Sequence, residues 1–75
     1  MASLIARSLD LRGNAVALAR TAVTMLELRS GELLEVLTDD PAAERDLAVW
    51  CRATGNLLVT RTREGATRHL LIRRR

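Results

Sequence analysis

The order of the hydrophobic patterns along the chain is the feature that most constrains its fold. Residues 8–12 alternate between polar and apolar side chains, which is typical of a short strand with one buried face. Residues 15–28 contain no Gly or Pro and are rich in Ala and Leu, which predicts a helix with Asn14 as its N-cap. The face of this helix that we expect to be buried carries apolar residues at helical spacing: Leu18, Ala22, Met25 and Leu26.

A second strand and a second helix follow in the same order. Residues 32–38 form the second predicted strand, and Asp40 and Pro41 then supply an N-cap and a first helical residue. The second helix is expected to run to about Ala53, where Gly55 and Asn56 end it. Its predicted buried residues are Ala43, Leu47, Trp50 and Cys51.

The end of the chain predicts a hairpin. Residues 57–62 and 67–73 have strand patterns, and the short link 63–66 joins them as antiparallel neighbours. The order is therefore βαβαββ, and two right-handed crossovers place both helices on the same side of the sheet. The sequence predicts an α/β two-layer sandwich, with a four-stranded mixed sheet and two helices on one face.

Length and cysteine content exclude several classes of protein. The chain has 75 residues with one Cys and one His, so it can form neither an internal disulfide nor a four-ligand zinc site. No apolar run approaches the roughly 20 residues of a membrane helix. We expect a cytoplasmic protein that uses no metal, no cofactor and no membrane. It forms one domain over residues 1–75, with 1–7 as an N-terminal extension and 74–75 as a frayed basic tail.

The charge of the chain leaves nucleic acid open as a partner. All twelve basic side chains are Arg, and the formal net charge is +3, which is also ordinary for a small soluble domain. One interpretation is a solvated surface with ion pairs. The alternative is an RNA-binding module whose phosphate contacts come from Arg12, Arg61, Arg63, Arg68 and Arg73.

Two helices can cover only one face of the sheet, so the other face is open. If Leu34 and Val36 face the helices, the alternation of strand residues places six side chains on the open face: Leu33, Glu35, Leu37, His69, Leu71 and Arg73. Such a mixture of leucines and charged groups is typical of a partner surface, although scattered surface leucines are also normal.

Three segments carry a resemblance to a known family: 9–13 (LDLRG), 30–43 (SGELLEVLTDDPAA) and 50–56 (WCRATGN). In this order and spacing the chain resembles the TusA/SirA-like sulfur-carrier family from residue 9 to residue 73. The resemblance implies the same fold as the one predicted above. That fold is also similar to the C-terminal domain of translation initiation factor three, which contacts RNA.

Members of that family carry a Cys-Pro-x-Pro motif at the start of the first helix. Free N–H groups there favour the thiolate that accepts sulfur as a persulfide. Counting on from Asp10 and Gly13, the resemblance places Val16 at the cysteine position, and Ala17 and Ala19 at the proline positions. A valine cannot accept sulfur, so we expect a degenerate site and a non-catalytic, protein-binding or regulatory homologue. Natural loss of the motif and deliberate redesign would leave the same sequence.

Cys51 is the only thiol and provides the alternative to this interpretation. It could relay persulfide as a substitute sulfur carrier, or it could be a small buried residue one turn after Leu47. For the binding function we expect another protein as the partner. The candidate contact residues are Arg12, Gly13, Asn14, Leu33, Leu37, Arg61 and Leu71.

Overall fold

The computed structural model describes residues 5–75, and expectations on residues 1–4 lie outside this range. Its elements follow the predicted βαβαββ order. They are β1 (Ile5–Asp10), α1 (Ala17–Met25), β2 (Leu33–Thr38), α2 (Pro41–Thr54), β3 (Leu57–Glu64) and β4 (Thr67–Arg73).

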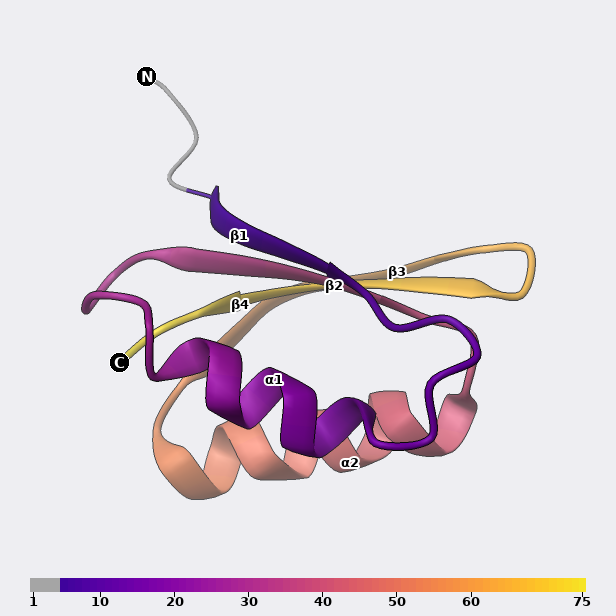
Figure 1. Cartoon of the computed structure of the whole chain (residues 1–75), viewed down its shortest axis with the longest axis horizontal. Coiled ribbons are helices and arrows are strands. Elements are labelled where there is room, and N and C mark those ends of the chain that lie inside the picture. Colours follow the sequence, from indigo (N-terminus) through magenta and orange to yellow (C-terminus); the bar gives the residue numbers. More distant parts are fainter. Residues whose placement is uncertain (1–4) are drawn as a thin grey trace.

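The four strands form one mixed sheet in the order β1-β2-β4-β3. β1 pairs with β2 in parallel, and β4 pairs antiparallel with both β2 and β3. Figure 1 shows both helices on the same side of this sheet, and within residues 5–75 no helix or strand covers the opposite side. The predicted two-layer α/β sandwich is therefore confirmed.

The core lies between the sheet and the helices. Leu34, Val36 and Ile72 are fully buried on the helix-facing side of the sheet, where the alternation of the strands predicts them. α2 contributes Leu47 and Cys51, while Ala43 and Trp50 are only partly buried at the edge of this cluster.

α1 is shorter than expected and buries a different face. It begins at Ala17, with Val16 rather than Asn14 as its N-cap, and it ends at Met25. Met25 is buried as predicted and Ala22 is half-buried, but Leu18 and Leu26 are 37% and 76% exposed, so the prediction is wrong for these two leucines. The buried positions of this segment, which share one side of the chain at helical spacing, are Ala17, Thr21, Thr24, Met25 and Leu28.

Turns on both sides explain why α1 is short. Gly13 has φ 75°, a left-handed conformation that interrupts the chain before the helix. After Met25, the N–H of Leu28 donates to the carbonyl of Met25 at 3.2 Å, an i to i−3 contact that tightens the chain beyond the α-helix.

α2 begins and ends as predicted. The carboxylate of Asp40 accepts the N–H of Ala42 at 2.9 Å, and Pro41 occupies the first helical position. Gly55 ends the helix with φ 79°.

Residues 5–7 and 74–75 are more ordered than expected. β1 starts at Ile5, so residues 5–7 belong to the sheet rather than to an N-terminal extension. The predicted frayed tail is wrong, because the N–H of Arg74 donates to the carbonyl of Glu32 at 2.9 Å and the N–H of Arg75 donates to Oδ1 of Asn56 at 2.9 Å.

The hairpin turn is tighter than expected. β3 continues to Glu64, so Gly65 and Ala66 alone connect it to β4, with φ 61° at Gly65. Within residues 5–75, no helix is long and apolar enough to span a membrane.

Candidate functional site

The start of α1 presents an exposed valine and a capping asparagine. Val16, at the expected carrier position, is the N-cap residue and is 57% exposed. Oδ1 of Asn14 accepts the backbone N–H of Val16 at 2.8 Å. The polar contact at this helix end therefore comes from Asn14, while the side chain of Val16 offers only carbon to solvent.

The loop before α1 is fixed by charged contacts. The guanidinium of Arg12 makes a bidentate contact with Asp10, with Nε–Oδ1 at 2.8 Å and Nη2–Oδ2 at 2.6 Å. These hydrogen bonds lower the pKa of Asp10 to about 2. The N–H of Gly13 donates to Oδ1 of Asp39 at 3.0 Å, which ties the loop to the segment before α2. The predicted contact residues Arg12, Gly13 and Asn14 thus form one ordered loop.

The only thiol lies away from this helix end. Ala43, near the start of α2, lines a cavity together with Val16, so the first turns of the two helices are neighbours. Cys51 follows eight residues later on α2, roughly 12 Å further along the helix at 1.5 Å per residue. It is 2% exposed, and burial raises its pKa to about 11. Cys51 therefore does not replace a thiol at the start of α1.

The open face of the sheet carries three adjacent leucines, as predicted. Leu33 and Leu37 lie on β2 and Leu71 lies on β4, and all three are half-buried. Leu71 is paired with Glu35, which places it diagonally between the two β2 leucines, within reach of both. At one end Ile5 pairs with Leu33, which extends the apolar surface to the edge strand.

The five arginines considered for RNA do not converge. Nε of Arg68 and Nη2 of Arg61 contact the carboxylate of Glu44 at 2.8 and 3.1 Å, on the helix-facing side of the sheet. Arg63 pairs with Arg68 in the register of the hairpin and belongs to the same cluster. Arg12 and Arg73 lie elsewhere, in the β1–α1 loop and on the open face.

Arg61 is consequently separated from the other predicted contact residues. Its register partner Leu70 is buried toward the helices, whereas Leu33, Leu37 and Leu71 lie on the opposite side. No sequence pattern points to Glu44, whose carboxylate contacts Arg61 and Arg68 and which only the packing of α2 near the hairpin reveals. Within residues 5–75, no group of three or more His, Cys, Asp or Glu side chains could hold a metal ion.

A βαβαββ sandwich with two helices on one face and a short ordered loop before α1 has the architecture expected of a sulfur-carrier domain. A model of the family described as sulfurtransferase TusA matches residues 7–74, and the chain belongs to this family. The resemblance found in the sequence is thereby confirmed.

Several similar proteins are named as sulfur carrier proteins. The chain is 41% identical over 59 residues to "Putative sulfur carrier protein YrkI" of Bacillus subtilis (strain 168), covering 76% of this chain and 79% of the relative. It is 33% identical over 55 residues to "Sulfur carrier protein TusA" of Allochromatium vinosum, covering 73% and 72%. A "Putative sulfur carrier protein" of Aquifex aeolicus (strain VF5) is 38% identical over 55 residues, which cover 71% of this chain but only 28% of that relative. The chain thus spans less than a third of the Aquifex protein.

Proposed function

We propose that this chain is a TusA-family domain that acts by binding another protein and does not itself carry sulfur. The observation that supports this proposal is the position of its only thiol. Cys51 is buried on α2, while the start of α1 presents Val16 and Asn14. Neither of these two side chains contains an atom that can accept and release a sulfane sulfur.

The chemistry of persulfide formation explains why a buried thiol argues against sulfur transfer. The thiolate is the nucleophile, and it must reach the donor sulfur. With its pKa raised to about 11, Cys51 is almost entirely protonated at neutral pH, and its 2% exposure leaves no approach for a donor protein.

The surface proposed for the partner is the open face of the sheet together with the loop before α1. Leu33, Leu37 and Leu71 supply an apolar centre, and Glu35 lies among them. Ser8 donates to Oε1 of Glu35 at 3.1 Å, so this carboxylate is held in place on the face. A flat apolar centre with fixed polar groups suits a protein partner better than a small molecule.

Persulfide relay through Cys51 is the second candidate. Its support is that Cys51 lines a cavity of about 260 Å³ together with Arg52 and Arg61, whose positive charges would favour a thiolate if the cavity opened. Burial outweighs this effect in the structure, since the pKa of Cys51 is raised.

Incubation with a persulfide donor, followed by intact-mass measurement, separates the two candidates. We expect no added sulfur on the native chain. The matched positive control is Val16→Cys in a Cys51→Ala background, which restores a thiol at the start of α1 and should gain the mass of one sulfur atom. A gain of one sulfur on the native chain that disappears in Cys51→Ala would overturn the proposal and assign sulfur relay to Cys51.

A further inference from the structure

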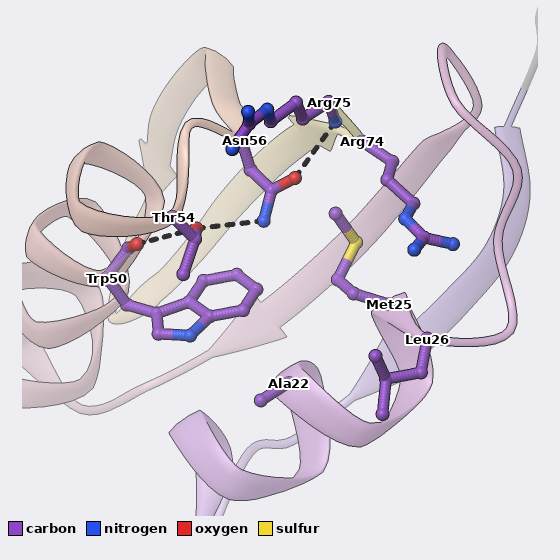
Figure 2. Close-up of a pocket in the computed structure, with 8 residues that line it drawn as sticks. All are labelled: Ala22, Met25, Leu26, Trp50, Thr54, Asn56, Arg74 and Arg75. Atoms are coloured by element: carbon purple, nitrogen blue, oxygen red, sulfur yellow. Dashed lines mark hydrogen bonds between the residues drawn. The ribbon is translucent and has the colours of Figure 1, made fainter.

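A cavity of about 310 Å³ lies between the C-terminal ends of α1 and α2, away from the open sheet face. Figure 2 shows its residues: Ala22 and Met25 come from α1, Leu26 directly follows that helix, Trp50 and Thr54 come from α2, Asn56 from the link to β3, and Arg74 and Arg75 from the end of the chain. Its volume falls at the lower end of the roughly 300–1,000 Å³ of small-molecule sites. The cavity can therefore hold a single aromatic ring or two fused rings.

An aromatic ring forms one wall of this cavity. Trp50 is the only aromatic residue of the chain, and it packs against the core without being fully covered. The indole lies across the cavity from Ala22 and Met25, so apolar atoms face it from α1 (Figure 2). Such a gap between an indole and aliphatic side chains suits a flat, apolar ring.

A fixed polar network holds the wall beside the indole. The hydroxyl of Thr54 donates to the carbonyl of Trp50 at 2.8 Å, and Nδ2 of Asn56 donates to that hydroxyl at 2.9 Å. Oδ1 of Asn56 then accepts the N–H of Arg75. This chain of hydrogen bonds positions the backbone of Arg75 at the mouth of the cavity.

Both charged side chains of the lining are positive. Arg74 and Arg75 both line the cavity, and among residues 5–75 no Asp or Glu does so. Nη1 of Arg74 donates to the carbonyl of Leu28. This hydrogen bond uses one of the five N–H groups of the Arg74 guanidinium. Within residues 5–75, the guanidinium of Arg75 makes no ion pair. Its side chain lies close to the backbone of Gly55, where a Cβ atom would be 3.0 Å from the Cδ of Arg75.

We propose that this cavity binds a small planar organic anion, such as an aromatic carboxylate. The ring lies against Trp50 and Met25, and the anionic group meets the guanidinium groups of Arg75 and Arg74. Arginine suits this role because its planar N–H groups match the two oxygens of a carboxylate. The inference is independent of the protein-binding function, since it concerns a different face of the domain.

Titration with naphthalene-2-carboxylate, followed by NMR, tests the proposal. Because the chain has one Trp, its spectrum contains one indole N–H signal, which reports on the cavity directly. We expect this signal to shift along a saturable curve. The neutral isostere naphthalene-2-carboxamide should bind about three- to fivefold more weakly, because it loses the exposed charge contacts.

Two cavity variants and one control complete the test. Arg75→Gln should weaken carboxylate binding about three- to fivefold and leave carboxamide binding unchanged. Ala22→Leu should abolish binding of both probes by filling the cavity. Arg45→Gln, on the exposed surface of α2 and outside the cavity, should have no effect. A non-saturable shift or equal affinity for the two probes would overturn the proposal. So would an effect of Arg45→Gln on carboxylate binding as large as that of Arg75→Gln.

Discussion

Oδ1 of Asn14 accepts a hydrogen bond from the N–H of Val16, so these two residues close the turn from which α1 starts. The end of a helix that carries free N–H groups favours negative charge. In this chain the amide oxygen of Asn14 satisfies part of that preference, and the side chain of Val16 projects into solvent. A thiol introduced at either position would therefore meet a different environment.

Val16→Cys should create a reactive thiol. In a Cys51→Ala background, the new thiol lies beside the free N–H groups of the first turn of α1, and we expect its pKa to fall below the usual value of about 8.5. The pH dependence of its alkylation rate measures this pKa. Val49→Cys in the same background is the matched control, since Val49 is 56% exposed within α2 and Val16 is 57% exposed. Equal pKa values for the two thiols would contradict the prediction.

A comparison of Asn14→Cys with Val16→Cys tests which of the two positions lowers the pKa of a thiol more. The sulfur of Asn14→Cys stands at the γ position, one bond nearer the backbone than the Oδ1 that now accepts the N–H of Val16, and we expect its thiolate to accept that N–H in place of the oxygen. We expect its pKa to be lower than that of Val16→Cys, measured by the same alkylation profile. A higher value would show that removal of the Asn14 contact loosens the turn.

Thr21 should be replaceable with a gain in stability. It is fully buried on α1, and its hydroxyl has no hydrogen-bond partner among the described residues. Thr21→Val keeps the shape and removes the unpaired polar group, so the free energy of unfolding should rise by about 1 kcal/mol. Thr24→Val is the matched control, because the hydroxyl of Thr24 donates to the carbonyl of Arg20 at 2.9 Å. Denaturant unfolding should show no gain for this second variant, and a similar gain in both would contradict the explanation.

The two helices differ in how much of their structure the sequence predicts. Local signals predicted the order of elements and the limits of α2, because Asp40, Pro41 and Gly55 act within a few residues of their own position. Thr21 and Thr24 could not be assigned to the buried face of α1, because both residues are polar and only the packing of the fold shows that they are buried.

Part of the candidate site was predictable from the sequence. Strand alternation placed Leu33, Leu37 and Leu71 together on the open face. It could not separate Arg61 from them, because that requires the register of β3 on β4, where a bulge between Leu58 and Thr60 shifts the pattern by one residue. The cavity beside Trp50 is formed by segments far apart in the chain, so no local pattern indicates it.

Binding of RNA by this chain should be weak and dependent on salt. Of the five arginines proposed for RNA contact, only those of the hairpin cluster around Arg63 lie together, and Glu44 already neutralises part of their charge through Arg61 and Arg68. We expect affinity for tRNA to be lost by about 0.15 M salt. Arg63→Gln should lower the log–log slope of affinity against salt by about one, whereas Arg12→Gln should not, because Arg12 is paired with Asp10. Tight binding at physiological salt would favour the RNA-binding alternative.

Cys51 should behave as a structural residue at neutral pH. Cys51→Ala removes a buried sulfur beside the core and should lower the free energy of unfolding by about 1 kcal/mol. Cys51→Ser should cost more, because its hydroxyl would be buried among apolar groups without a partner. Thiol reagents should label the native chain slowly and the unfolded chain rapidly. Rapid native labelling, with no change in stability in either variant, would contradict this role.

The same thiol should make stability fall at alkaline pH. Burial raises the pKa of Cys51 from 9.0 to about 11, so the unfolded chain releases its proton first. The stabilisation is complete below pH 9 and is lost as the pH rises toward 11, with a slope of up to about 1.4 kcal/mol per pH unit. The chain has no Tyr and no Lys, so Cys51 is the only side chain that titrates in this range. Denaturant unfolding of the native chain and of Cys51→Ala, from about pH 8 to about pH 11, isolates the effect. The two curves should converge and then cross as the pH rises, because the loss over about two pH units exceeds the advantage of the native chain at neutral pH. Parallel curves would show that Cys51 ionises equally in both states.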